Sequence, residues 1–429
     1  MKQPKQPPAS FTGYQKFAIF ILALTMFTVV LDFMVMSPLG DILMKSLGLK
    51  PAHFGFAVSA YALSAGISGL LTAGFADRYD RKKLLLFFYT GFIAGTLLCG
   101  IANTYPLLLG ARIITGLFGG VIGSISMAIV ADLFDLQHRG RVMGFMQMGF
   151  GASQVLGIPI GLYLANIWGW HAPFLWVAVM AIVIAILIVV RMQPLTKHLL
   201  VKQDKSALTH LLNTLAKKDY RIGFSATALL SIGGFMMMPF GSAFAINNLR
   251  ITQHQLPLLF MVAGISTLVV MPLIGKLSDK VDKFKIFTLA SAWMIIMVLI
   301  YTNLSATPLL LVIMFNVLMM AGIMSRMIPS SALITGIPVL QDRGAFMSIN
   351  SSLQQIAGGI AAACAGMIVV QKDKFSPLEH YNTLGYIIVG ITILSVYLLS
   401  RVSSLVKRKT IEGSKEQPVV AREPELIIE

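Results

Sequence analysis

Long apolar runs separated by short polar segments fill the sequence between about residues 16 and 401. A run of about 20 apolar residues is long enough to cross the hydrocarbon core of a bilayer as an α-helix. The spacing of the runs predicts twelve such helices in two sets of six, at residues 16–191 and 221–401. We therefore expect an all-α polytopic membrane protein with twelve transmembrane helices.

Three polar segments flank or separate the two predicted bundles. Residues 1–15 are polar and rich in Pro, which is typical of a disordered tail, and residues 402–429 form a second polar tail. Residues 192–220 are basic and polar and are expected to link the two bundles. A linker of this length would allow the bundles to rock against each other.

Composition independently argues against an ordinary soluble protein. Hydrophobic residues make up 56% of the 429 residues and charged residues only 12%, where about 25% charged is typical of soluble domains. The net charge is +16, and most of the 34 Lys and Arg residues fall in the tails, the linker and alternate loops. The positive-inside rule then places both termini in the cytoplasm. We expect this charge to orient the chain and to contact anionic membrane lipids, and we expect no nucleic-acid partner.

One basic loop occurs twice, half a chain apart. The first copy runs from Ala73 to Lys83 and the second from Gly275 to Lys285. In both copies a small residue precedes an Asp, a basic residue follows that Asp, and a second Asp–basic pair comes three residues later. Such an internal repeat in a polytopic chain predicts two related halves.

The doubled loop resembles the signature loop of the major facilitator superfamily, Gly-x-Leu-x-Asp-Arg/Lys-x-Gly-Arg/Lys. It departs from that pattern at Asp80 and Asp282, which stand where Gly is usual, and in the first copy Ala73 stands in the leading Gly position, with Gly74 one residue late. The resemblance implies two pseudo-symmetric six-helix halves, and it implies that the loops act as a conformational latch at the cytoplasmic face. The residues carried over to that latch are Gly74, Asp77, Arg78, Arg81, Lys82, Asp279 and Lys280.

Ionisable residues inside the predicted spans are rare. Asp32 is the acidic residue deepest in a predicted helix, and Arg112 and Arg326 are the two intramembrane cations. An ionisable group in hydrocarbon costs at least ~2.5–3.5 kcal/mol, so it should face the bundle interior or a wet cavity. We interpret Asp32 as a proton carrier, with a structural, hydrogen-bonded Asp as the alternative. Arg112 lies in a segment that resembles a family motif linked to proton transfer, and snorkelling to the interface is its alternative.

The fifth predicted helix, at about residues 142–166, carries a small residue at every fourth position. This spacing makes a smooth face for close helix packing. Part of it resembles the Gly- and Pro-rich antiporter motif of drug exporters, which favours export over uptake; ordinary packing is the alternative. Because helices 5 and 8 meet across the halves in the superfamily, we expect this face at that interface. The motif residues are Gly149, Ser153, Gly157, Pro159 and Gly161.

A Gly pair and a Pro interrupt the apolar run at residues 233–240. An interruption of this kind predicts a broken helix beside a cavity, and the Met and Phe residues around it suit varied apolar ligands. For any single Met or Phe, core packing is the alternative. The candidates for the substrate cavity are Asp32, Met36, Arg112, Phe235, Met238, Asn316, Arg326 and Gln354.

The sequence contains no evident nucleotide-binding, catalytic-triad or metal-ligand pattern. We therefore expect a transporter rather than an enzyme, with no cofactor or metal and with a proton gradient as the energy source. The leading hypothesis is proton-coupled efflux of small apolar or amphiphilic organic compounds. The alternative is uptake or facilitated transport of a specific solute or a lysolipid-like cargo. Since one chain supplies both halves, we expect a monomer in the plasma membrane, such as a bacterial inner membrane.

Overall fold

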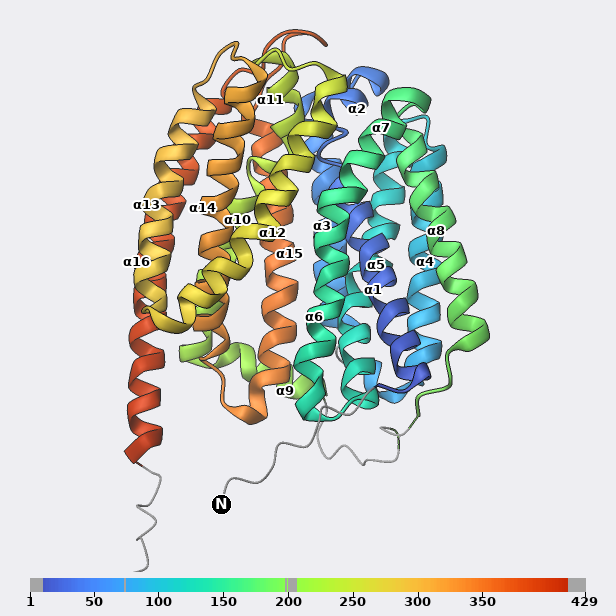
Figure 1. Cartoon of the computed structure of the whole chain (residues 1–429), viewed down its shortest axis with the longest axis vertical. Helices are drawn as coiled ribbons and strands as arrows, with labels where there is room; N and C mark the ends of the chain where they lie inside the picture. The colour runs from blue at the N-terminus through green and yellow to red at the C-terminus, as the bar shows by residue number, and fades with distance from the viewer. Residues whose placement is uncertain (1–10, 73–74, 197–198, 200–206, 416–429) are drawn as a thin grey trace, which may run out of the picture.

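A computed structural model describes residues 11–72, 75–196, 199 and 207–415. Gly74 and most of the predicted first tail lie outside the described residues, as does the side chain of Asp77. In the described part the regular structure is helical, apart from one isolated bridge between Val370 and Glu379. The long helices run side by side along the long axis of the molecule (Figure 1).

The first half lies on one side of the molecule and contains residues 13–191 (Figure 1). Its helices are α1 (Gly13–Val35), α2 (Gly40–Leu47), α3 (Pro51–Thr72), α4 (Arg81–Ile101), α5 (Tyr105–Leu133), α6 (Leu136–Ala152), α7 (Ile158–Trp168) and α8 (His171–Arg191).

The second half follows the short helix α9 (Ala207–Ala216), which lies at the lower end of Figure 1. Its helices are α10 (Lys218–Phe235), α11 (Gly241–Asn247), α12 (Leu256–Lys280), α13 (Lys283–Thr302), α14 (Leu309–Thr335), α15 (Arg343–Ile368) and α16 (Tyr381–Lys415). The start of α1 and the end of α16 lie at the same end of the molecule as α9 (Figure 1).

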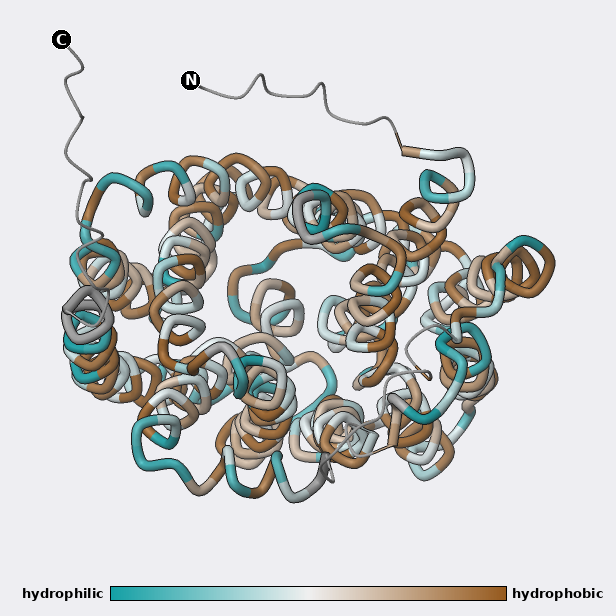
Figure 2. The backbone as a smooth tube through the Cα atoms, turned by 90° about the horizontal axis from the view of Figure 1, so that it is seen from below, coloured by the Kyte–Doolittle hydropathy of each residue, from teal (hydrophilic) through white to brown (hydrophobic). Residues whose placement is uncertain are grey.

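Eleven helical segments of the described chain are long and apolar enough to cross a membrane. The helix α15 is equally long but is not one of the eleven, because Ser, Asn and Gln residues interrupt its apolar sequence. Figure 2, seen from the lower end, shows apolar residues dominating the helices and hydrophilic residues gathered in the loops. This distribution is that of a multi-pass integral membrane protein.

The predicted broken helix is confirmed. The helix α10 ends at Phe235, a 3₁₀ turn spans Met238–Phe240, and α11 begins at Gly241. Pro239 lacks an amide hydrogen and cannot continue the helix. The chain breaks in the same way between α1 and α2, around Ser37 and Pro38, so the two interruptions occupy corresponding places in the two halves.

The most extensive contacts between the halves are those of α3 with α15 and of α7 with α12. At the first pair, a Cβ added at Gly55 would lie 2.8 Å from the carbonyl oxygen of Ala362. At the second, a Cβ added at Gly264 would lie 3.1 Å from the carbonyl oxygen of Gln154. The expected contact between the fifth and eighth predicted spans is therefore confirmed. The second span (α3) also meets the eleventh (α15), and small residues permit both close approaches.

The predicted position of the small-residue face of residues 142–166 is wrong. A Cβ added at Gly157 would lie 2.7 Å from Leu31, and one at Gly161 would lie 3.0 Å from Val35. Gly149 approaches the carbonyl of Ala23 in the same way. The face thus packs on α1 inside its own half, and other residues of the same helix meet α12.

The same helix contains a π turn at Ser153–Gly157, between α6 and α7. The amide of Ile158 donates to the carbonyl of Ser153, five residues earlier. Pro159 follows at once, and its missing amide and bulky ring disfavour regular α-helical bonding one turn earlier. The π turn accommodates that defect and occurs where α12 of the other half packs.

Candidate functional site

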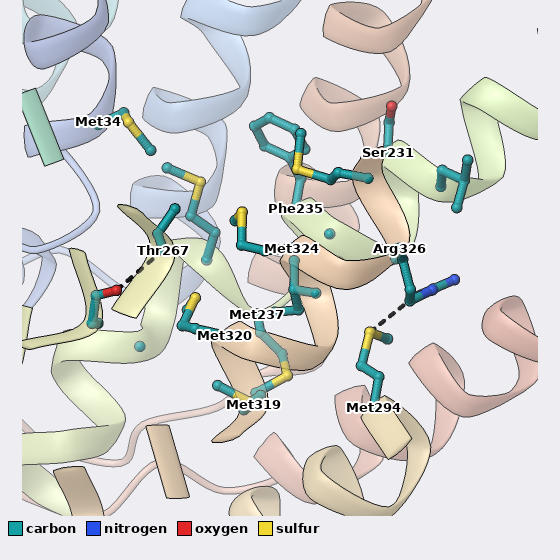
Figure 3. Close-up of a pocket in the computed structure, with 18 of the residues that line it drawn as sticks. Met34, Ser231, Phe235, Met237, Thr267, Met294, Met319, Met320, Met324 and Arg326 are labelled. Carbon is teal, nitrogen blue, oxygen red and sulfur yellow. Dashed lines mark hydrogen bonds between the residues drawn. The ribbon is translucent and has the colours of Figure 1, made fainter. Parts of the chain in front are cut away.

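A cavity of about 430 Å³ lies between the halves. Most of its lining comes from the second half, while α1 and the π turn contribute Met34 and Gln154 from the first. Apolar side chains predominate, and Figure 3 shows several methionines whose side chains surround the same space. The lining methionines are Met34, Met237, Met238, Met294, Met319, Met320, Met324, Met327 and Met347. A cavity of this size can hold a drug-sized molecule.

The structure divides the predicted cavity residues into two groups. Those that line the cavity are Phe235, Met238, Asn316, Arg326 and Gln354. Asp32, Met36 and Arg112 do not line it, and each is 0% exposed in the interior of the first half. Because a helix turns by about 100° per residue, Asp32 and Met36, which follows the end of α1 in helical conformation, lie on one face, while Met34 lies on another face and lines the cavity.

Asp32 and Arg112 form a fully buried ion pair. Nη1 of Arg112 lies 2.9 Å from Oδ2 of Asp32 and 3.4 Å from its carbonyl oxygen. The hydroxyl of Thr96 donates to the other carboxylate oxygen at 3.1 Å. The guanidinium lies 4.5 Å from the centre of the Tyr61 ring. One carboxylate therefore holds groups of α1, α4 and α5 together beside α3.

A second buried guanidinium, that of Arg326, belongs to the cavity wall itself. Its Nη1 donates to the sulfur of Met294 at 2.8 Å, and its carbon Cζ lies 5.1 Å from the centre of the Phe287 ring. Its Nε is buried and has no hydrogen-bond partner. Among the described residues that line the cavity, Arg326 is the one charged side chain.

One end of the cavity is closed by polar contacts between the halves, which the sequence analysis did not identify. Oδ1 of Asp41 accepts a hydrogen bond of 2.7 Å from the side chain of Asn247. Nζ of Lys45 lies 2.8 Å from Asp41 and 3.2 Å from Oδ1 of Asn247. The hydroxyl of Ser37 donates to the carbonyl of Met238, and the hydroxyl of Ser242 donates to the backbone carbonyl of Ser37. The cavity extends from this end toward the end of α14, where Thr335 lines it.

The first signature loop contacts its own half. Nε of Arg81 lies 3.3 Å from Oδ2 of Asp132 at the end of α5, and Nη1 of Arg81 donates to the carbonyl of Ala76. Nζ of Lys82 donates to the carbonyl of Val189 at the end of α8. Arg78 lies in a 3₁₀ turn and is exposed.

The second copy contacts the end of α16. Asp279 and Lys280 are exposed and border a shallow groove that also includes Lys407. Nζ of Lys407 lies 2.7 Å from Oδ2 of Asp282. Hydrogen bonding and charge from Lys407 lower the pKa of Asp282 below its usual value.

Asp80 and Asp282, which stand where the family pattern has Gly, each have a local structural role. Asp80 accepts a hydrogen bond from the amide of Lys82 at the start of α4, and Asp282 accepts bonds from the amides of Phe284 and Lys285 at the start of α13. Each Asp is thus the N-cap of the helix that follows it. An Asp directly before a helical apolar run is a recognisable capping signal, and the sequence analysis missed it.

A polar cluster connects the linker with the start of α15. Asp342 accepts hydrogen bonds from Lys217, from the hydroxyl of Tyr220 at 2.7 Å and from His210 at 3.1 Å. These donors, Lys217 first, lower the pKa of Asp342 to about 2. The helix α9 carries His210, so this carboxylate fastens the linker helix to the second half.

Comparison with known sequences gives one family. The profile of the Major Facilitator Superfamily matches residues 22–362 and, in a second match, residues 223–427. An uncharacterized MFS-type transporter of Bacillus subtilis, YceJ, is 24% identical over 91% of this chain and 98% of its own. Multidrug resistance protein 3 of the same organism is 36% identical, over 27% of this chain and 23% of its own.

Solved structures show the same fold. The crystal structure of a D-xylose-proton symporter superposes with a TM-score of 0.73 at 16% identity, covering 89% of this chain and 97% of that one. Two helical halves around a central cavity, built from membrane-crossing segments, define a polytopic membrane transporter rather than an enzyme. The chain belongs to the major facilitator superfamily.

Proposed function

We propose that this protein exports small apolar or amphiphilic organic compounds in exchange for protons, by alternating access. The observation that carries the proposal is the fully buried ion pair of Arg112 with Asp32, since Asp32 lies on the helix that also supplies Met34 to the cavity. The multidrug resistance relative supports export of drug-like compounds. The Met-rich lining supports a pocket that adapts to ligands of different shape.

The ion pair offers a physical route by which protonation of Asp32 could be coupled to a change of the cavity. With Asp32 ionised, its charge is balanced by Arg112 in a site that excludes water. A proton on Asp32 would leave Arg112 as an uncompensated buried charge, which costs several kcal/mol and favours a rearrangement. Because Met34 and Ser37 follow Asp32 closely on the chain, a shift of this part of α1 would reach the cavity wall and the closed end.

The proposal also covers the membrane topology and the role of the signature loops as a conformational latch. If α15 also crosses the membrane, the spans number twelve, which would place both termini on one side; the basic loops favour the cytoplasmic side of a bacterial inner membrane. Arg81 and its partner Asp132, together with the Lys407–Asp282 pair, would hold the cytoplasmic helix ends in place. The transport unit is a monomer in contact with lipids, and the proton gradient replaces any cofactor.

The experiment is proton-driven dye accumulation in inverted membrane vesicles. Wild type is expected to accumulate a lipophilic dye, a protonophore to abolish accumulation, and Asp32→Asn to be inactive. Asp135→Asn is the matched control, because Asp135 is exposed and makes no side-chain capping bond. Full proton coupling in Asp32→Asn would show that Asp32 does not carry the proton.

A further inference from the structure

Arg112 and Arg326, which are both buried within long helices, differ in how their charge is balanced. Arg112 and Arg326 lie on α5 and α14, the corresponding helices of the two halves. Arg112 has the carboxylate of Asp32 at 2.9 Å. Arg326 is 7% exposed, and the partners that the described residues give it are the Met294 sulfur and the Phe287 ring, with no ion pair.

An unpaired guanidinium in a buried, largely apolar cavity wall favours binding of an anion. Buried charges in proteins are usually paired because an uncompensated ion in an apolar interior is costly. A thioether is a weak acceptor, so Met294 satisfies one N–H poorly, and Nε is left without a partner. Arg326 lines the cavity at the edge of the methionine group, where a bound ligand could reach it (Figure 3).

The rest of the cavity lining favours a ligand that has an apolar body and no positive charge. Its lining is largely apolar, and the described lining residues include no Asp or Glu that could neutralise a cationic ligand. The buried carboxylates of Asp32 and Asp41 lie outside the lining, and each already has a cationic partner, Arg112 and Lys45 respectively. Gln354 and Asn350 add neutral hydrogen-bonding groups.

We propose that the ligand of this cavity is an amphiphilic organic anion, whose carboxylate, sulfonate or phosphate group pairs with Arg326 while its apolar body lies among the methionines. This inference rests on the proposed transport function and names the substrate class of the same cavity. A guanidinium can bind such a group with two parallel N–H donors, which fixes the ligand's orientation. The negative group can belong to a free compound or to a lipid headgroup.

A matched pair of fluorescent probes tests the charge directly. 1-Anilinonaphthalene-8-sulfonate is an anion, and N-phenyl-1-naphthylamine has nearly the same aromatic body without charge. We would measure binding of both to the purified full-length protein in phosphatidylcholine nanodiscs, with empty nanodiscs subtracted. The variants are Arg326→Met, which keeps an apolar wall, Arg326→Lys, which keeps the charge, and Arg221→Met, which removes an exposed Arg outside the cavity.

The expected result is a loss specific to the anion. Because a hydrogen-bonded charge contributes about 1.5–3 kcal/mol, Arg326→Met should weaken sulfonate binding by at least about tenfold. Binding of the neutral probe should be unchanged, Arg326→Lys should retain part of the sulfonate affinity, and Arg221→Met should bind like wild type. An equal loss for both probes, or no preference of wild type for the anion, would overturn the proposal.

Two further binding measurements distinguish an inorganic anion, a lipid headgroup and a free amphiphile as the ligand. Displacement of the sulfonate by chloride at millimolar concentration would mean an inorganic anion site and would overturn the organic ligand. Weaker sulfonate binding in phosphatidylglycerol nanodiscs would support the site and assign it to a lipid headgroup, whereas unchanged binding would assign it to a free amphiphile. Ligand binding does not require transport. If vesicles accumulate no dye but sulfonate binding still depends on Arg326, the proposed export is refuted and the anion site stands.

Discussion

Asp41 of α2 and Asn247 of α11 join the two halves of the molecule through a hydrogen bond of 2.7 Å. The carboxylate of Asp41 is 1% exposed, and Lys45 completes the contact from the same helix. These residues follow the breaks in the first helix of each half, so corresponding segments of the two halves meet at this end. The bond closes the end of the cavity opposite α9.

The first prediction concerns this closed end. Asn247→Ala removes the partner of a buried carboxylate, and a hydrogen bond to a charged group is worth about 1.5–3 kcal/mol. The ratio of conformers open at this end to closed conformers should therefore rise by about tenfold or more. Distance distributions between spin labels on α2 and α11 would measure it.

The matched control for the closed end is Asn303→Ala. Asn303 is exposed and its side-chain amide donates to Leu299 within the same half. An equal shift in both variants would show that Asn247 has no special part in closure.

Arg112 and Arg326 should respond differently to replacement by Met. Arg112→Met leaves Asp32 buried without its counterion, which should destabilise the protein by about 3–5 kcal/mol. Arg326→Met removes an unpaired charge from an apolar wall, so the ligand-free protein should keep or gain stability. Thermal unfolding of both variants in one detergent compares them, and a severe loss in Arg326→Met would indicate a partner that balances its charge.

The linker cluster predicts a dependence of stability on pH. The pKa of Asp342 is lowered to about 2, chiefly by Lys217, whereas an unperturbed Asp has a pKa of about 3.9. A carboxylate with a lowered pKa stabilises the folded state above its unfolded value, and that contribution is lost as the pH falls through its folded value.

The wild-type protein should therefore unfold at a higher temperature than Asp342→Asn at pH 5 to 7, and the difference should shrink between about pH 4 and pH 2. Asp373→Asn, at an exposed loop residue, is the control. A constant difference down to pH 2 would show that the charge of Asp342 does not hold the linker.

Helix contact across the halves can be tested with a single methyl group. In Gly55→Ala the new Cβ would lie 2.8 Å from the carbonyl oxygen of Ala362, a backbone atom that cannot move aside cheaply. We expect lower thermal stability and impaired transport. Gly110→Ala is the control, since a Cβ there meets nothing within 4 Å and Ala favours the helix by about 0.5–1 kcal/mol. Equal behaviour of the two variants would contradict the tight α3–α15 contact.

The sequence determined the class of protein and its repeat. Apolar runs of membrane length define their own helices, because a chain in lipid must satisfy its backbone hydrogen bonds within each segment. The doubled loop around Asp77 and Asp279 marked the two halves, and the Gly pair with Pro239 predicted the break after α10. Each of these signals is local, so each could be read without knowing the packing.

The direction in which each helix faces was decided only by the tertiary structure. A helix that is apolar all round carries no polar stripe to mark its inner face. The sequence therefore placed Asp32, Met36 and Arg112 in the cavity, whereas packing of α1 against α5, α6, α8 and the π turn directs them into the first half. For the same reason the sequence marked Arg112 and Arg326 alike, and only the fold gave a carboxylate to one of them and an open apolar cavity to the other.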